Sequence, residues 1–282
     1  MRIDAILKKG ETLLSAAGIE EAKLDAFYLL EHCFSMNRME YLMHCDKEGD
    51  AAAERRYFSL IKKRSEHIPL QQLTGEQDFM GYTFLVNEHV LIPRQDTETL
   101  VEELLPLAKG KRVLDMCTGS GCILISLALK AGILSGVGAD ISPEALEVAK
   151  ENARRLGAAE AAVDGLQFIE TDLFEKIEGA FDLIVSNPPY IETKELAGLQ
   201  PEVRLHEPML ALDGKEDGLY FYRRIIEKAE NYLTPGGILA FEIGYNQGKA
   251  VSELMLAAGY QGVQVKKDLP GLDRIVTGKL CK

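Results

Sequence analysis

The spacing of hydrophobic residues predicts that the chain begins with a helical region. From residue 1 to residue 74 the apolar positions recur every three or four residues, as at Ile3, Ile6 and Leu7, which is typical of amphipathic helices. A further helix is expected over residues 51–66, because Pro69 prevents its continuation. We therefore expect a small helical domain over residues 1–74, of a size that suits substrate docking better than catalysis.

Residues 75–93 have the pattern of a β-hairpin. Apolar runs over residues 79–86 and 90–92 flank the polar turn Asn87-Glu88-His89. We expect this hairpin to link the helical domain to the remainder of the chain.

From residue 94 to residue 282, apolar strand patterns alternate with helical ones. Helices are expected over residues 122–130 and 143–156, the second with Ser142 as its N-cap. Strands are expected over residues 112–116, 137–141, 167–171, 181–186, 237–243, 262–266 and 274–278. This alternation predicts an α/β domain, in which a mainly parallel seven-stranded sheet is covered by helices on both faces.

The segment Asn187-Pro188-Pro189-Tyr190 directly follows the strand expected over residues 181–186. Two consecutive prolines have no backbone N–H, so the strand must stop there and leave its last carbonyls free. We assign the Asn187 side-chain oxygen and the Pro188 carbonyl as acceptors for the two hydrogens of a planar NH2 group, with the Tyr190 ring packed against it and Pro189 completing the binding segment. An amide or an exocyclic amine fits this arrangement, whereas the motif alone leaves an ordinary Pro-Pro loop open.

A glycine-containing turn follows the first expected strand and is a candidate cofactor site. Its residues are Asp115, Cys117, Thr118, Gly119, Ser120 and Gly121. Position 124 is a leucine, where a dinucleotide-binding turn has its third glycine, so the turn argues against NAD. Asp115 would repel a pyrophosphate but attract a cationic ligand such as S-adenosylmethionine.

Two further acids end the next two expected strands, at the same edge of the sheet. Asp140, followed by Ile141, is expected to accept hydrogen bonds from ribose hydroxyls. Asp172, followed by Leu173, is a candidate contact for an adenine amine. Each acid has a structural alternative, since Asp140 could cap the following helix and Asp172 a turn.

Composition narrows the class of protein. The net charge of −12 argues against a surface that grips nucleic-acid phosphates. The five cysteines form no CxxC pair and the chain has no HExxH motif, so neither a disulfide framework nor a metal site is expected. The chain also shows no signal peptide and no long apolar span, and we expect a cytoplasmic monomer without stable membrane or nucleic-acid contacts.

These motifs together resemble the PrmC/HemK family of release-factor glutamine methyltransferases, which are class I S-adenosylmethionine-dependent methyltransferases. The resemblance covers essentially the whole chain. It is carried by residues 69–75, 90–94, 113–115, 118–122, 140–146, 186–191, 207–208, 211–212, 217–219, 235–237 and 242–244.

The resemblance implies methyl transfer from S-adenosylmethionine to N5 of the glutamine in the Gly-Gly-Gln motif of class 1 peptide chain release factors, with S-adenosylhomocysteine as product. It also implies that the N-terminal helical domain helps to recognise the release factor, and that the cofactor site extends to Asn187. Similar proteins have glycine at the position of Cys117, which predicts weaker cofactor binding here. They also have Pro-Glu where this chain has Gln95-Asp96.

Three alternatives remain. A ribosomal-protein glutamine methyltransferase would have the same motif, and the sequence separates it only through resemblance in the N-terminal domain. A DNA adenine-N6 methyltransferase would offer the same planar NH2 group, but its need to grip a duplex and flip a base conflicts with the acidic charge. In the third, Cys117 spoils cofactor binding and leaves a docking protein for release factors. An ion pair between Arg94 and Glu207 is a further open possibility.

Overall fold

The computed structural model of the protein describes residues 1–281 and contains two compact units. The first unit comprises Met1–Glu76 and Gln200–His206, and the second comprises Gln77–Leu199 and the chain from Glu207 onward. The chain therefore leaves the second unit after Leu199 and returns to it at Glu207.

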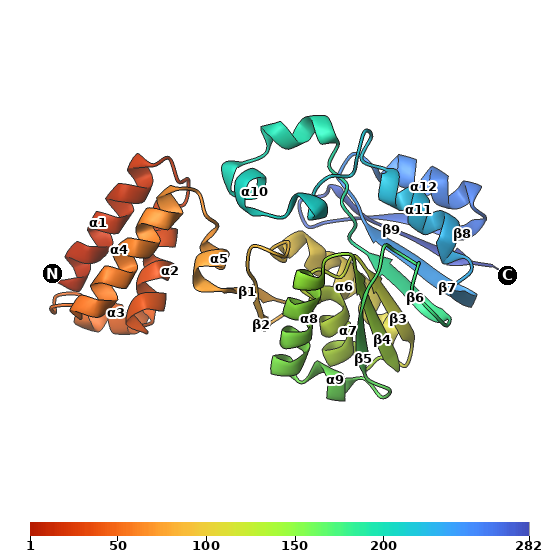
Figure 1. Ribbon diagram of the computed structural model, residues 1–282, viewed down its shortest axis with the longest axis horizontal. Helices are drawn as coiled ribbons and strands as arrows, with labels where there is room; N and C mark the ends of the chain where they lie inside the picture. Colours follow the sequence, from red (N-terminus) through yellow and green to blue (C-terminus); the bar gives the residue numbers. More distant parts are fainter. Residues whose placement is uncertain (282) are drawn as a thin grey trace. The chain divides into compact units, whose positions relative to one another are not determined.

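The first unit is helical, as the spacing of its apolar residues predicts (Figure 1). Its helices are α1 (Ile3–Ala16), α2 (Ala22–Phe34), α3 (Arg38–His44), α4 (Ala51–Ser65), α5 (Leu70–Thr74) and α10 (Pro201–His206). The apolar faces of α1, α2 and α4 meet in one core around Ile6, Leu29 and Tyr57, each of which is fully buried. The Asp50 side chain caps α4 by accepting hydrogen bonds from the backbone N–H groups of its first turn.

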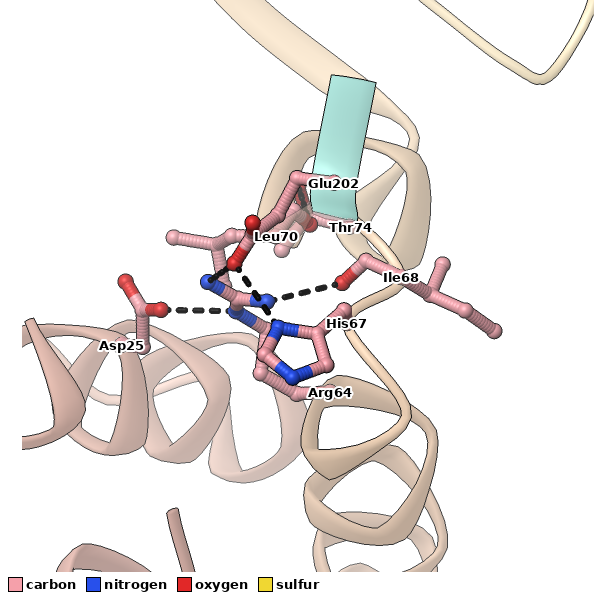
Figure 2. A network of polar contacts seen from close by, with 7 residues as sticks. All are labelled: Asp25, Arg64, His67, Ile68, Leu70, Thr74 and Glu202. Atoms are coloured by element: carbon pink, nitrogen blue, oxygen red, sulfur yellow. Dashed lines mark hydrogen bonds and ion pairs between the residues drawn. The ribbon is translucent and has the colours of Figure 1, made fainter. Parts of the chain in front are cut away.

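A buried polar network joins α10 to the other helices of this unit (Figure 2). The Arg64 guanidinium contacts Asp25 Oδ2 at 2.7 Å and Glu202 Oε1 at 2.9 Å. His67 Nδ1 lies 3.4 Å from the same glutamate oxygen. Burial alone would raise the pKa of Glu202, but hydrogen bonds to its carboxylate bring that pKa below its usual value. A short segment from late in the chain is thus anchored by charge to the N-terminal helices.

The linking hairpin consists of β1 (Glu76–Phe79) and β2 (Tyr82–Leu85). The prediction that the hairpin turns at residues 87–89 is wrong, because the observed turn lies at Met80 and Gly81. Both residues have positive φ, 54° and 80°, as the tight two-residue turn of a hairpin requires. The predicted second strand over residues 90–92 is wrong as well, since that segment is irregular and Val90 packs onto a helix instead.

The second unit contains the predicted α/β sheet. Its strands are β3 (Arg112–Met116), β4 (Ser135–Asp140), β5 (Leu166–Glu170), β6 (Phe181–Ser186), β7 (Leu233–Glu242), β8 (Tyr260–Lys267) and β9 (Asp273–Leu280). They lie in the order β5-β4-β3-β6-β7-β9-β8, and every pairing is parallel except the two made by β9. The predicted mainly parallel seven-stranded sheet is confirmed, with strand ends that differ by a few residues.

Helices cover both faces of this sheet (Figure 1). The helices and short helical turns of this unit are α6 (Gln95–Ala108), α7 (Cys122–Ala131), α8 (Pro143–Leu156), α9 (Ala158–Ala161), η1 (Thr193–Gly198), η2 (Met209–Ala211), α11 (Tyr220–Ala229) and α12 (Gly248–Ala257). One hydrophobic core lies between the sheet and α6, α7 and α8, and a second lies beneath α11 and α12. The central strands β3 and β6 are buried almost throughout, which explains their continuous apolar runs. Over residues 1–281, no helix is both long and apolar enough to cross a membrane.

Candidate active site

The order of the strands places a crevice at the carboxyl ends of β3 and β6. From β3 the chain proceeds to β4 and β5 on one side, and from β6 to β7 on the other, so these two strands flank the topological switch point. A cavity with an empty volume of about 1130 Å³, part of it open to solvent, lies there. The predicted site residues that line it are Cys117, Thr118, Gly119, Ser120, Asp140, Ile141, Asp172, Leu173, Asn187 and Pro189.

The turn after β3 is held open toward this cavity. Asp140 Oδ2 accepts a hydrogen bond from Gly119 N at 2.9 Å, and its other oxygen accepts one from Ser142 N at 3.0 Å. Gly119 has a φ of 54°, and a Cβ atom there would meet nothing within 4 Å. The space above its backbone is therefore free for a ligand, next to a carboxylate that retains acceptor capacity.

Asp115 lies beneath the turn and does not line the cavity, in contrast to the direct cofactor contact predicted for it. It is fully buried, and its Oδ2 accepts hydrogen bonds from Thr118 Oγ1 at 2.7 Å and from Leu124 N at 3.3 Å. Burial raises the pKa of Asp115 to about 7, although these two hydrogen bonds oppose the shift. Its position assigns it to shaping the turn. Gly121 is also outside the cavity, and a Cβ atom there would lie 2.9 Å from the Ile125 side chain on α7.

Cys117 has a φ of 63°, in the left-handed region that favours glycine. This conformation explains in physical terms why glycine suits the position better. The cysteine lines the cavity, and burial raises the pKa of its thiol far above the usual value. The side chain is thus a neutral group in the ligand space.

Asp172 forms an ion pair that the sequence analysis did not foresee. Its two carboxylate oxygens accept hydrogen bonds from Arg224 on α11, at 3.0 and 3.2 Å. This fork fixes the carboxylate at the cavity wall while each oxygen keeps a further lone pair.

The acceptor segment, residues 187–190, follows β6, and the end of β6 is hydrogen-bonded to the end of β3. Ser186 Oγ donates a hydrogen bond to the Met116 carbonyl at 2.6 Å, which joins the two strand ends. Asn187 and Pro189 line the cavity, whereas Pro188 and Tyr190 are outside its lining. The Tyr190 ring packs against the second hydrophobic core, and burial raises the pKa of its hydroxyl to about 12. The ring is thus partly buried against this core, and its packing against a substrate stays a prediction.

Gln247, at the start of α12, fixes the backbone of the acceptor segment. Its Nε2 donates to the carbonyls of Tyr190 at 3.0 Å and Gly218 at 3.3 Å. Its Oε1 accepts from Gly244 N at 3.0 Å and from the Tyr222 hydroxyl at 3.3 Å. Sequence reasoning missed this residue because a glutamine between a strand and a helix carries no distinctive signal.

Glu242 ends β7 beside Asn187. Ser186 is paired with Phe241 in the parallel ladder, so Asn187 and Glu242 follow side by side at the carboxyl ends of adjacent strands. Glu242 is 2% exposed. Burial raises its pKa to about 7, against hydrogen bonds from the side chains of Thr97 and Asn187 and the charge of Arg274. In the sequence, Glu242 belongs to the segment 242–244 that carries part of the family resemblance. An acid at the carboxyl end of a strand was the signal that could have identified it.

The loop that returns to the second unit closes one side of the cavity. Arg94 Nη2 donates to Glu207 Oε1, which confirms the ion pair that the sequence left open. Arg94 lines the cavity, as do Pro208, Leu210 and Ala211. Burial raises the pKa of Glu207 even though Arg94 opposes the shift. The pair thereby connects the segment after the hairpin to the returning loop.

Comparison with solved structures supports the assignment of the fold. A methyltransferase from Pyrococcus furiosus superposes with a TM-score of 0.54 at 18% identity, covering 72% of this chain and 91% of that one. Trm5 from Methanocaldococcus jannaschii, in complex with adenosine, has a TM-score of 0.51 at 16% identity and covers 73% of this chain and 56% of its own. These likenesses show that the chain has the fold of these proteins.

Sequence comparison identifies the family. The model of the PrmC N-terminal domain matches residues 5–75, and that of the methyltransferase small domain matches residues 94–201. A release factor glutamine methyltransferase from Cereibacter sphaeroides is 42% identical over 282 residues, covering 99% of both chains. One from Geobacter sulfurreducens is 40% identical over 269 residues, covering 95% of this chain and 93% of the relative. The chain belongs to the release factor glutamine methyltransferase family.

Proposed function

We propose that this protein transfers a methyl group from S-adenosylmethionine to the side-chain amide nitrogen of a release-factor glutamine, in the cytoplasm. The Gly-Gly-Gln motif of class 1 release factors supplies that glutamine in this proposal. The observation that carries it is the placement of Asn187 and an acid-lined cavity at the same edge of the sheet, in a chain of this family.

The residues present fit the proposed cofactor. The open space above Gly119 would admit the ligand backbone, Asp140 would accept hydrogen bonds from ribose hydroxyls, and Asp172 with Leu173 would border the adenine. The acids of the cavity favour a cationic ligand. When bound, S-adenosylmethionine supplies an electrophilic methyl group on a positively charged sulfur.

The chain's own contribution to the reaction is to hold the acceptor amide. An amide nitrogen is a weak nucleophile because its lone pair is delocalised into the carbonyl. The Asn187 side-chain oxygen and the Pro188 carbonyl would accept its two hydrogens and fix the direction of the nitrogen. These acceptors strengthen as positive charge develops on the nitrogen, so they favour the transition state over the ground state.

The helical unit would serve substrate recognition. Its α3 carries exposed apolar side chains, with Met39 at 71% and Leu42 at 70% exposure, which suit contact with another protein. Residues 1–74 would thus form the recognition domain, residues 75–93 the linker and residues 94–282 the catalytic domain.

Mass spectrometry tests the proposal directly. Purified release factor is incubated with the protein and S-adenosylmethionine, digested and analysed for one added methyl group on the Gly-Gly-Gln glutamine. A parallel reaction with duplex DNA and radiolabelled cofactor tests the adenine alternative. Labelled DNA with unmodified release factor would contradict the proposal.

A further inference from the structure

We infer that Glu242 is a positioning residue that orients the side-chain amide of Asn187, so that its oxygen, and not its nitrogen, faces the acceptor group. This inference rests on the proposed function, because it concerns the group that would hold the substrate amide. Glu242 itself is outside the cavity lining and acts through Asn187.

The ladder between two neighbouring strands places the two side chains together. Ser186 of β6 pairs with Phe241 of β7, and Asn187 and Glu242 are the next residues along each strand direction. Ser186 is hydrogen-bonded to the Met116 carbonyl, and the Glu242 carbonyl accepts from the Tyr222 hydroxyl at 3.0 Å. Both strand ends are therefore held, and the orientation of the Asn187 amide depends on its side-chain partner.

The chemistry of the pair determines that rotation. An ionised carboxylate only accepts hydrogen bonds, whereas an asparagine amide has one accepting and one donating end. Asn187 and Glu242 are neighbours at adjacent strand ends, and hydrogen bonding from the Asn187 side chain lowers the pKa of Glu242, so the ionised carboxylate accepts from the Asn187 NH2 group. The amide oxygen then points away from Glu242, and Asn187 borders the cavity. An asparagine without such a partner would present either end to the substrate.

The groups around Glu242 fix the position of its carboxylate but do not fully compensate its charge. Thr97, which is 2% exposed, provides a second hydrogen bond. Arg274 is the nearby cation, but its guanidinium is engaged by Asp268 and Asp96, each at 3.0 Å. Glu242 Oε2 has no hydrogen-bond partner within residues 1–281. A buried carboxylate with one unpartnered oxygen is costly for stability, which is a common feature of groups kept for function.

The groups that face Glu242 come from several elements. Arg274 of β9 and Asp96 of α6 act on its charge, and Tyr190, Tyr222 and Cys122 also interact with it electrostatically. The two tyrosines and the cysteine have raised pKa values and remain neutral near pH 7. Among them, Glu242 itself is the group expected to change charge near pH 7, since burial raises its pKa to about 7.

Glu242→Gln tests the inference, because glutamine has the same shape but presents both a donor and an acceptor to Asn187. With release factor as substrate, kcat should fall on the order of 10- to 100-fold, while KM and the calorimetric dissociation constant of S-adenosylmethionine stay within about twofold. Glu253→Gln, which alters an exposed glutamate on α12, is the matched control and should leave kcat unchanged. A wild-type kcat in folded Glu242→Gln would overturn the inference.

Two further measurements exclude a merely structural role. The melting temperature of Glu242→Gln at pH 8 should equal or exceed that of the wild type, because the substitution removes a buried charge. The wild-type kcat should fall as the pH drops through about 7, and Glu242→Gln should abolish that dependence. Asp115 also titrates near pH 7, so Asp115→Asn is measured in parallel. A pH dependence that persists in Glu242→Gln, or a lowered melting temperature at pH 8, would count against the inference.

A readout without substrate separates this inference from the proposed function. The side-chain amide signals of Asn187 in ¹⁵N-labelled protein are assigned by their loss in Asn187→Ala. They should shift with pH around 7 in the wild type and not in Glu242→Gln. Absence of release-factor methylation by the wild type would contradict the function alone, whereas pH-independent Asn187 signals in the wild type would contradict the inference alone. If Glu242→Gln does not fold, Thr97→Val replaces it in every assay, with Thr97→Ser as the control that keeps the hydroxyl and should lose less kcat.

Discussion

Two buried carboxylates near the cavity of the second unit differ from the buried carboxylate of the helical unit in how their charge is compensated. In the helical unit, Asp25 is in direct contact with the Arg64 guanidinium, which also holds Glu202. In the unit that contains the sheet, Asp115 and Glu242 are fully enclosed and neither is in direct contact with a cation, so burial raises both pKa values to about 7. Oδ1 of Asp115 and Oε2 of Glu242 have no hydrogen-bond partner within residues 1–281.

The difference separates charges that hold the fold from charges that shape the site. A carboxylate paired with arginine has most of its burial cost compensated, and its removal leaves the partner charge exposed to a low-dielectric environment. A carboxylate buried without a cation destabilises the folded state and persists where its charge or its hydrogen bonds serve another purpose. Asp115 supports the turn next to the cavity, and Glu242 contacts the proposed acceptor residue.

The largest expected effect is on chemistry at the sheet edge. Asn187→Ala should lower kcat for release-factor methylation by at least about 10³-fold, or about 4 kcal/mol in the barrier, because it removes an acceptor that strengthens in the transition state. The dissociation constant of S-adenosylmethionine, measured by calorimetry, should change little. Asn231→Ala, at an exposed position after α11, is the matched control. Turnover of Asn187→Ala at the wild-type rate would show that the residue beside Glu242 has no role in the reaction.

The next effect is on stability in the helical unit. Arg64→Ala should lower the free energy of unfolding by about 3 kcal/mol, measured with urea, because it leaves Asp25 and Glu202 without their shared cation. The double substitution Asp25→Leu with Arg64→Met should recover part of this loss, since it removes the most buried pair together and leaves the more exposed Glu202 beside His67. A loss below about 1 kcal/mol would show that the pair is no stronger than a surface ion pair.

Much of the fold could be predicted from the sequence because its signals are local. The buried runs of β3 and β6 and the helical spacing of α1 and α2 reflect burial of each element on its own. The hairpin turn was misplaced because residues 79–86 form a nearly continuous apolar run. Only Gly81 marks the turn within it, after a methionine that adopts positive φ. The positions of α10 and Arg64 depend on contacts between residues more than 100 positions apart, for which the sequence has no local signal.

The candidate site shows the same limit. Gly119 and Asn187 follow strands and Asp140 ends one, and parallel strands bring their carboxyl ends to one edge, so their proximity was predictable. The sequence could not show that the Tyr190 ring packs partly against the core, or that Asp115 lies under its turn and not in the cavity. Side-chain direction at a strand end depends on the packing of neighbouring elements, here Gln247 just before α12 and Thr118 in the turn.

Stability as a function of pH should reveal the uncompensated charge of Asp115. A carboxyl group whose pKa is about 7 when folded and near its usual value of 3.8 when unfolded binds its proton more tightly in the folded state. Its contribution to stability is therefore complete below about pH 4 and is lost as the pH rises through 7. The free energy of unfolding of Asp115→Asn, relative to that of the wild type, should rise by about 2 kcal/mol between pH 4 and pH 8, after allowance for relaxation around the buried site. Urea unfolding at four pH values measures this difference, and a constant difference would indicate that Asp115 titrates normally.

The smallest effect expected is at Cys117, where the cost is in the backbone and not in charge. A residue with a Cβ atom at a φ of 63° is strained relative to glycine by about 1 kcal/mol. Cys117→Gly should therefore raise the free energy of unfolding by about 0.5 kcal/mol, since glycine also gains entropy in the unfolded chain. The removal of the side chain from the cavity should tighten S-adenosylmethionine binding by roughly fivefold in calorimetry. Cys117→Ala separates the two causes, because it removes the thiol but keeps the Cβ atom. If alanine matches glycine in both measurements, the thiol, and not the left-handed backbone, is what lowers stability and cofactor affinity at this position.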